Sequence, residues 1–549
     1  MLGYEVIAQR LVALGVDTVF AVMGDGNLLL LAELSENHGV RIVHARHEAG
    51  AVGMADGYHR MTGRLGVATV THGPGFTNAA TSVATATAHR SKVLVLVGGL
   101  AAGDVFNLQR LDQSAFTRSL GAERVSLSTP QRVDADVLLA ARTALRKPGT
   151  VVLDIPTDVQ GAETGITSVA EHDLLDLAPW LSPHPELVAR AASALASADR
   201  PVLLAGRGAS GDRAITEIAA LADESGARIV TSLLGKGNFW GHPLALGVAG
   251  GLGNAKASAA LAEADCIVSF GASLNEWTTT RHSYAEGCTI VQIDTDPMAF
   301  ERFSRVDVAV PGDATSTASG IRAALATVGA QQSAEAAQRA ASPSAQLPPD
   351  TAPEGGHSDG DSVDPRRACA AFNAALATSR AVVVDGGHVC IWGTQLIDVH
   401  EPRSYTHGFS FGSIGQSLSL ALGAAAGLDG RPVVAVMGDG SAAMSIAELE
   451  TAVRERLPVI VLILNDGGFG IERHTLAMLD KPVTESNYPA PDFARMANAL
   501  GASGVVISNE RDLQSIGVHL ARSGPIVFDI RVNGDLIAQT FLEIKQLRR

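Results

Sequence analysis

Short apolar runs alternate with helix-length amphipathic segments along most of the chain. Runs of about five residues rich in Val, Ile and Leu are typical of strands buried on both faces of a parallel sheet. Because a helix-length segment separates each run from the next, the first part of the chain is predicted to be a doubly wound α/β domain over residues 1–165. Its apolar runs lie at residues 19–23, 41–45, 66–71, 93–97 and 151–155.

The same alternation recurs twice, so residues 185–330 are predicted to form a second domain and residues 363–549 a third. In the third domain, a helix-length segment from Ser445 to Arg456 lies between two apolar runs and predicts a βαβ unit. The predicted fold class is therefore α/β, with three doubly wound parallel-sheet domains. The apolar runs of these two domains lie at residues 201–205, 228–231, 266–270, 289–293, 381–384, 432–437 and 458–464.

The composition changes between residues 331 and 362, where Ala, Ser, Pro, Gly and Gln dominate. Such a segment cannot build a hydrophobic core, so it is predicted to be an exposed linker. The 549 residues of the chain are enough for about three or four domains with full cores.

Charge and cysteine content narrow the classes of partner and compartment. The net charge of −15 argues against nucleic acid and anionic membranes as partners. The four cysteines lack CxxC spacing and are predicted to be buried, reduced thiols. The chain begins without a basic and then apolar leader, and no apolar stretch reaches about 18 residues. We therefore expect a soluble, cytoplasmic protein.

Polar clusters follow the two apolar runs of the predicted βαβ unit. Gly-Asp-Gly at 438–440 follows one run directly, and Asn-Asp at 465–466 follows the other. Because the carboxyl ends of parallel strands bind ligands in open α/β sheets, Asp439 and Asp466 are expected to meet over one site. Two carboxylates beside free backbone N–H groups at a glycine-rich turn suit Mg²⁺ that is also held by a diphosphate. The alternative is an ordinary turn in which Asp439 is a helix N-cap.

The spacing of these clusters resembles the thiamin diphosphate motif, in which GDG is followed by about two dozen residues and then Asn-Asn. Here residues 441–464 place 24 positions between the two clusters, and Asp466 stands where the family has its second Asn. The three-domain layout resembles the acetolactate synthase and pyruvate decarboxylase superfamily. This resemblance implies thiamin diphosphate and Mg²⁺ as cofactors, with Asp439, Asp466 and the main-chain carbonyl of Gly468 as metal ligands.

The resemblance also assigns roles to the domains. The N-terminal domain would bind the aminopyrimidine and the C-terminal domain the diphosphate, with the active site assembled between two chains of a dimer or tetramer. Other residues of the third domain are expected to contact the cofactor. These cofactor-binding residues are His388, Gly412, Ile414, Gly438, Gly440, Ser441 and Phe469.

Glu48 follows the apolar run 41–45 and begins a helix-like segment, Ala49 to Met61. A carboxylate in this position often only stabilises the helix dipole. The surrounding sequence, which continues to Asp56-Gly57-Tyr58, resembles the region around the indispensable acid of the family. The resemblance implies that Glu48 protonates the aminopyrimidine ring, which favours the imino tautomer that removes the proton from thiazolium C2.

Two other residues resemble parts of the cofactor site. Ile414, within Gly412 to Gly415, matches the apolar wedge that holds thiamin in its bent conformation; the alternative is ordinary core packing. His388 resembles a residue that contacts diphosphate oxygens, although a loop histidine that caps the backbone is an alternative.

Three polar residues are candidates for contact with the substrate. Glu472 matches a glutamate of pyruvate-decarboxylase-like members that handles protons at the substrate carbon; its alternative role is a helix cap. His72 stands at the Ser position of the Ser-Gly-Pro-Gly-Ala-Thr-Asn turn of acetolactate synthases. Gln109 resembles the Gln of the family's Phe-Gln-Glu loop, but Leu108 and Arg110 depart from that pattern, which argues against acetolactate specificity.

The second domain contains a GxGxxG sequence at 206–211. The next predicted strand ends in Thr231-Ser232 without the acid that would bind a ribose, so hydride chemistry with NAD is not expected. In the family this domain binds FAD, ADP or nothing, so the resemblance allows FAD as a further cofactor.

The sequence therefore predicts a thiamin diphosphate and Mg²⁺ enzyme that makes or breaks a carbon–carbon bond next to a carbonyl, most similar to acetolactate synthases. The substrate would be a small 2-oxo acid, aldehyde or acyl-CoA. One alternative is a 2-oxo acid decarboxylase or 2-hydroxyacyl-CoA lyase. A non-catalytic nucleotide-binding homologue is the alternative from another class, and the presence of Glu48, Asp439 and Asp466 argues against it.

Overall fold

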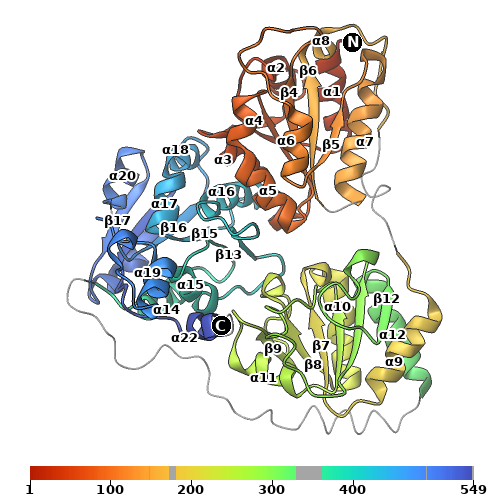
Figure 1. Cartoon of the computed structure of the whole chain (residues 1–549), viewed down its shortest axis with the longest axis vertical. Helices are drawn as coiled ribbons and strands as arrows, with labels where there is room; N and C mark the ends of the chain where they lie inside the picture. Colours follow the sequence, from red (N-terminus) through yellow and green to blue (C-terminus); the bar gives the residue numbers. More distant parts are fainter. Residues whose placement is uncertain (147–148, 172–180, 329–361, 490, 547–549) are drawn as a thin grey trace.

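The structure is a computed structural model that describes residues 1–146, 149–171, 181–328, 362–489 and 491–546. Three six-stranded sheets follow one another along the chain, and their strands pair in parallel (Figure 1). Helices cover the sheets, which confirms the predicted fold class of doubly wound α/β domains.

The predicted domain boundaries remain a proposal. Residues 331–361 of the predicted linker lie outside the described part of the chain.

The first sheet has the strand order β2-β1-β3-β4-β6-β5. Its strands are β1 (Thr18–Ala21), β2 (Arg41–His44), β3 (Gly66–Val70), β4 (Val93–Gly99), β5 (Glu123–Ser126) and β6 (Thr150–Pro156). The helices around it are α1 (Gly3–Ala13), α2 (Leu28–Glu36), α3 (Glu48–Thr62), α4 (Pro74–Asn78), α5 (Ala80–His89), α6 (Gln113–Ser119), α7 (Val133–Arg146) and α8 (Thr157–Gly161).

The middle sheet has the order β12-β11-β10-β7-β8-β9. Numbered from its own first strand and read from the other edge, this is 3-2-1-4-5-6, the order of dinucleotide-binding sheets. Its strands are β7 (Pro201–Ala205), β8 (Arg228–Thr231), β9 (Ala245–Val248), β10 (Cys266–Phe270), β11 (Thr289–Asp294) and β12 (Val308–Pro311). Its helices are α9 (Pro185–Ala196), α10 (Asp212–Ser225), α11 (Ala255–Glu263) and α12 (Ala314–Val328).

The third sheet has the order β14-β13-β15-β16-β18-β17, which repeats the topology of the first sheet. Its strands are β13 (Ala381–Val384), β14 (Tyr405–His407), β15 (Val433–Gly438), β16 (Val459–Asn465), β17 (Ser503–Ile507) and β18 (Ile526–Arg531). Its helices are α14 (Pro365–Ala375), α15 (Val389–Leu396), α16 (Ser417–Gly427), α17 (Asp439–Ser445), α18 (Leu449–Arg454), α19 (Gly470–Met478), α20 (Phe493–Ala499), α21 (Ile516–Leu520) and α22 (Gln539–Gln546).

Six strands lack a predicted counterpart in the sequence pattern. Five of them, β5, β9, β12, β14 and β17, lie at sheet edges, where one side of a strand needs no partner and a long apolar run is not required. The sixth, β18, lies between β16 and β17, and Asp529 interrupts its apolar run.

The predicted helix from Ser445 to Arg456 is wrong at its start. The chain becomes helical at Asp439, with α17 followed by a 3₁₀ turn at Ile446–Glu448 and then α18. Gly438 is the extended N-cap residue, so Asp439 lies in the first turn instead of capping the helix. A carboxylate is favoured there by the helix dipole.

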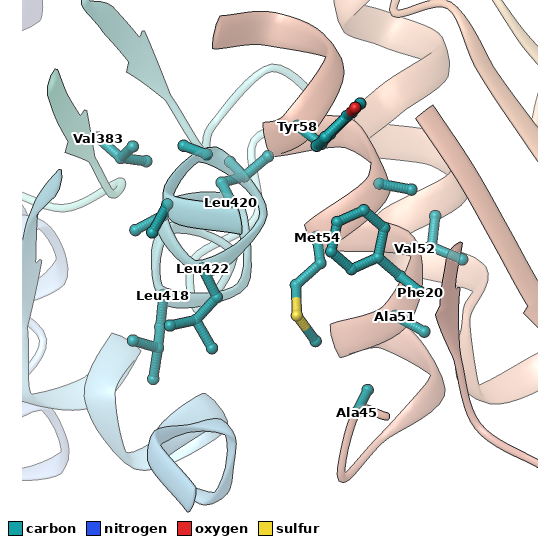
Figure 2. Close-up of a cluster of buried hydrophobic side chains, with 14 of the residues drawn as sticks. Phe20, Ala45, Ala51, Val52, Met54, Tyr58, Val383, Leu418, Leu420 and Leu422 are labelled. Atoms are coloured by element: carbon teal, nitrogen blue, oxygen red, sulfur yellow. The ribbon is translucent and has the colours of Figure 1, made fainter. Parts of the chain in front are cut away.

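Helices α3 and α16 join the first and third domains through one hydrophobic core. Figure 2 shows Met54 and Tyr58 of α3 beside Leu418, Leu420 and Leu422 of α16. Glycines allow the two backbones to approach closely. A Cβ on Gly57 would overlap the carbonyl oxygen of Leu420, and one on Gly423 would overlap that of Met54. The start of α3 is therefore fixed relative to the third domain.

Within the described residues, no helix is long and apolar enough to cross a membrane. All four cysteines are free and buried, as predicted.

We predict that Gly423→Ala destabilises the protein by about 1–3 kcal/mol, because the added methyl group overpacks the α3–α16 contact. Gly517→Ala in α21 is the matched control, since a Cβ there would have no neighbour within 4 Å. Alanine has a higher helix propensity than glycine, so this control should lose no stability. Urea unfolding of both variants checks the prediction, and equal stability of the two would contradict the packing argument.

Candidate active site

The strand order of the third sheet reverses between the neighbouring strands β13 and β15. The next strand after β13 lies on one side of this pair, and the next strand after β15 lies on the other. In such sheets the crevice outside the carboxyl ends of these strands is the usual ligand site. Asp385 follows β13, Asp439 follows β15 and Asp466 follows β16. The fold therefore brings the predicted GDG and Asn-Asp clusters to one edge.

Asp439 and Asp466 are buried beside each other at this edge. Asp439 is 2% exposed, and its Oδ2 accepts a hydrogen bond from the N–H of Gly468 at 3.2 Å. Burial raises the pKa of both carboxyl groups. Burial raises the pKa of Asp466 to about 7. The positive charge of Arg473 opposes this rise, and the negative charge of Asp439 adds to it. Two carboxylates held this close favour a bound cation.

The residues at this edge fit a Mg²⁺ ion. Hard oxygen ligands are available from two carboxylates and from the backbone of Gly468. No group of three His, Cys, Asp or Glu side chains converges in the part of the chain that the structure describes. An ion here would therefore need further oxygens from the backbone and from a bound ligand. A diphosphate is a ligand that supplies such oxygens to Mg²⁺. Glycine at position 470 keeps this edge open, because a Cβ there would lie 2.9 Å from Asp466 Oδ2.

Asp385 holds the loop that carries Ile414, and the sequence did not identify this role. Its buried carboxylate accepts the N–H groups of Gly415 at 3.1 Å and Ser417 at 3.0 Å, and the Ser417 hydroxyl at 2.6 Å. Ile414 lies close to Gly386, where a Cβ would be 3.1 Å from its Cγ2. Ile414 and Gly412 line a cavity, so the predicted wedge faces open space rather than a sealed core.

This cavity has a volume of about 1770 Å³ and lies between the three domains. It contains both predicted metal-binding carboxylates and most residues expected to contact the cofactor. The predicted site residues that line it are His388, Gly412, Ile414, Gly438, Asp439, Gly440, Ser441, Asp466, Gly468, Phe469 and Glu472. Residues of the N-terminal domain that the sequence predicted for catalysis, Glu48, His72 and Gln109, are not among the described residues that line it.

His388 is buried and uses one ring nitrogen within the fold. Its Nε2 accepts the backbone N–H of Ala538 at 3.0 Å. The ring packs against His474 at 4.4 Å and Phe541 at 5.3 Å between centroids, and burial lowers its pKa to about 3. The neutral ring therefore carries its proton on Nδ1, which is the nitrogen that remains for a phosphate oxygen.

Glu48 is the first residue of α3, one position earlier than the sequence predicted for the helix. It follows the N-cap His47, so it lies in the first turn, where the helix dipole favours a carboxylate. Asn78 donates a hydrogen bond to Glu48 Oε2 at 3.0 Å. Glu48 is thus oriented by the turn that follows β3.

His72 and Gln109 lie together near this turn. His72 is 5% exposed, and burial lowers its pKa. Gly73 has a φ of +59°, and a Cβ there would overlap the carbonyl oxygen of Gln109. The predicted site residues therefore form two groups, one in the third domain at the cavity and one in the first domain around Glu48, whose neighbours His47, Ala49 and Asn78 also line the cavity.

Glu472 lies in the first turn of α19 and is exposed to the cavity. No side-chain hydrogen bond caps this helix, so the alternative role as an N-cap is not what the structure shows.

Glu448 links the two domains, and sequence analysis missed it. Its carboxylate, on a residue 3% exposed, accepts the backbone N–H of His47 at 2.9 Å and of Arg46 at 3.1 Å. Thr451 donates to the same carboxylate at 2.9 Å. A Cβ on Gly50 would overlap it. Its only sequence signal is an acid inside an apolar helical segment, which does not reveal a partner about 400 residues away.

Three segments of the chain match the domains of one enzyme family. Residues 1–116 match the thiamine pyrophosphate enzyme N-terminal TPP binding domain, residues 188–321 the central domain, and residues 385–530 the C-terminal TPP binding domain. Thiamine pyrophosphate is another name for thiamin diphosphate. Together the matches cover most of the chain.

Three relatives illustrate the similarity of the whole chain. An acetolactate synthase of Mycobacterium bovis is 29% identical, covering 97% of this chain and 88% of the relative. The acetolactate synthase isozyme 3 large subunit of Escherichia coli is 29% identical, covering 97% of this chain and 95% of the relative. A sulfoacetaldehyde acetyltransferase of Castellaniella defragrans is 27% identical, covering 93% and 88%.

We predict that Glu448→Gln lowers the free energy of unfolding by about 1–3 kcal/mol, because the amide group would face backbone N–H donors and leave one unpaired. Glu224→Gln is the control, since its side chain is 44% exposed and forms a surface ion pair with Arg322 within the middle domain. Such pairs contribute about 0–1 kcal/mol. Urea unfolding measures both, and a Glu448→Gln protein as stable as the control would refute the role of Glu448 in linking the domains.

Proposed function

Because the chain belongs to the thiamine pyrophosphate enzyme family, we propose that it is a Mg²⁺-dependent carboligase of the acetolactate synthase type that acts on a small 2-oxo acid. The observation that carries this proposal is the pair of buried carboxylates, Asp439 and Asp466, beside Gly468 at the switch point of the third sheet. Both carboxylates line a cavity large enough for a cofactor and a small substrate.

Thiamin diphosphate, when bound, supplies a carbon nucleophile that attacks the substrate carbonyl. Asp439, Asp466 and the carbonyl of Gly468 would hold Mg²⁺ on its diphosphate. Gly440 and Ser441 lie in the first turn of α17, where N–H groups have no partner within the helix and suit phosphate oxygens. Ile414 would support the cofactor from its loop.

Glu48 would exchange a proton with the aminopyrimidine ring of the cofactor. It needs a fixed carboxylate for this task, and Asn78 together with the packed start of α3 supplies the orientation. His72 and Gln109, on the same side of the first domain, would contact the substrate.

We propose that the active site is completed by a second copy of the chain, as a dimer or tetramer. Glu48 does not line the cavity that contains Asp439, although its neighbours His47, Ala49 and Asn78 do, so the cavity of one chain offers the cofactor only one of the two groups that the reaction needs. The loop before Gln109 supports a partner surface, because Val105, Phe106 and Leu108 are 81%, 87% and 95% exposed. A two-fold axis would give two equivalent sites.

The middle domain supports an additional proposal of a bound nucleotide such as FAD. Its sheet has the strand order of dinucleotide-binding domains, and Gly206 to Gly211 follows its first strand, β7. The free, buried cysteines support the proposed cytoplasmic location.

One observation favours a second candidate function. Glu472 presents a carboxylate to the cavity that contains Asp439 and Asp466, where it could handle a proton at the substrate carbon. This arrangement suits a 2-oxo acid decarboxylase or 2-hydroxyacyl-CoA lyase. Product analysis with pyruvate separates the candidates, since a carboligase yields acetolactate and a decarboxylase yields acetaldehyde.

We predict that thiamin diphosphate with Mg²⁺ raises the melting temperature of the protein and that Asp439→Ala abolishes this shift. A ligand that binds only the folded protein adds about 2.7 kcal/mol at 100 times its Kd. The control is Asp223→Ala on α10, whose side chain is 65% exposed. Differential scanning fluorimetry is the measurement, and a normal shift in Asp439→Ala would overturn the metal assignment.

The shared site predicts complementation between inactive variants. Glu48→Gln and Asp439→Ala chains should each be inactive, and subunit exchange between them should restore activity at the sites that combine an intact Glu48 with an intact Asp439. Mass spectrometry shows whether mixed dimers form, and an activity assay follows the recovery. Mixed dimers without recovered activity, or an active monomer, would contradict the shared site.

A further inference from the structure

Asp466 occupies the position at which the thiamin diphosphate motif has a neutral Asn, and the structure gives this carboxylate a cationic partner. Arg473 Nη2 donates to Asp466 Oδ2 at 2.6 Å, and Arg473 Nη1 donates to the carbonyl oxygen of Asp466 at 3.1 Å. The Asp466 side chain is 2% exposed and that of Arg473 is 12% exposed. The guanidinium therefore fixes both the side chain and the main chain of the expected metal ligand.

Arg473 is itself anchored at two further places. Its Nη2 donates to the carbonyl oxygen of Gly534 at 2.9 Å, and its Nη1 lies 3.3 Å from Asn487 Oδ1. A Cβ on Gly534 would overlap the guanidinium, so the backbone packs directly on it. Because Arg473 lies on α19 and its side chain contacts three separate loops, the planar guanidinium has little freedom to turn away from Asp466.

This geometry divides the two oxygens of Asp466. Oδ2 is occupied by Arg473, which leaves Oδ1 for a metal. Asparagine has a single oxygen, so an amide here would place its NH₂ group either against the guanidinium donors or toward the metal, and both arrangements are unfavourable. The positive charge of Arg473 also offsets the charge that Asp466 adds to a site already containing Asp439.

We propose that Arg473 is a positioning residue that holds Asp466 Oδ1 toward the metal and makes an aspartate, rather than an asparagine, the suitable ligand in this chain. The two residues act as one neutral unit. This inference rests on the proposed function, since it concerns a metal that binds together with thiamin diphosphate.

The test is a double-mutant cycle on cofactor binding, which does not depend on turnover. Isothermal titration calorimetry measures thiamin diphosphate affinity in excess Mg²⁺ and then Mg²⁺ affinity at saturating thiamin diphosphate. Arg473→Gln should weaken Mg²⁺ binding by about 10- to 100-fold, the usual effect of losing an outer-shell partner. Asp466→Asn should weaken it by a similar factor, because the amide turns its NH₂ group toward the guanidinium or the metal. The double variant should recover to within about tenfold of the wild-type protein, because its two amides can pair and still leave an oxygen for the metal.

Two controls separate this role from a loss of folding. Arg473→Lys keeps the charge but loses the two-pronged contact, so it should lie between wild type and Arg473→Gln. Arg495→Gln changes an arginine whose side chain is 89% exposed and should bind Mg²⁺ as wild type does. Circular dichroism melts identify any variant that is unfolded. If Arg473→Gln is unfolded, the Mg²⁺ affinity of Arg473→Lys decides whether Arg473 positions the metal ligand.

The outcomes distinguish this inference from the proposed function. A wild-type protein that binds thiamin diphosphate without any need for a divalent ion overturns the proposed function and the inference with it. Wild-type metal dependence together with unchanged Mg²⁺ affinity in Arg473→Gln and Arg473→Lys overturns the inference alone. Single effects that simply add in the double variant also overturn it, because a unit of two residues must show coupling.

Discussion

The close packing of α3 on α16 is the contact on which the rest of the structure depends. Paired glycines bring the two backbones together, and the core around them belongs to the first and third domains at once. Glu48 begins α3, and Glu448 of the third domain binds the two N–H groups immediately before it. The segment that holds Glu448 starts at Asp439, so the two halves of the proposed chemistry are connected by a short stretch of the chain.

Buried charge defines the candidate site as much as its shape does. Asp385, Asp439 and Asp466 all lie at the carboxyl ends of adjacent strands, but their surroundings differ. Asp385 is satisfied by N–H and hydroxyl donors of its own domain, which makes it structural. Arg473 is the cationic side chain that pairs with Asp466, and it does not neutralise Asp439 as well. Burying two carboxylates is costly unless a further cation compensates their charge. A metal ion bound between these two carboxylates would offset the free-energy cost of burying them.

The sequence predicted the features that depend on local pattern. Continuous apolar runs located the central strands, and the spacing from Asp439 to Asn465 located the cofactor motif, because both are encoded within a few dozen residues. Edge strands such as β14 were missed, since three residues with one free edge need no apolar run. Glu448 and Arg473 were missed for another reason: their roles come from contacts with Arg46, His47 and Gly534 that only the folded chain creates. That Glu48 does not line the cavity containing Asp439 likewise follows from domain packing and could not be derived from their spacing.

The central claim is that Asp439 and Asp466 hold a divalent ion that is shared with the diphosphate of thiamin diphosphate. Electron–nuclear double resonance of the protein with Mn²⁺ in place of Mg²⁺ tests this directly, since it detects phosphorus nuclei bound through oxygen to the metal. The account predicts ³¹P couplings when thiamin diphosphate is present, and none with thiamin, which lacks phosphate. Bound Mn²⁺ that shows no ³¹P coupling in the presence of thiamin diphosphate would contradict it.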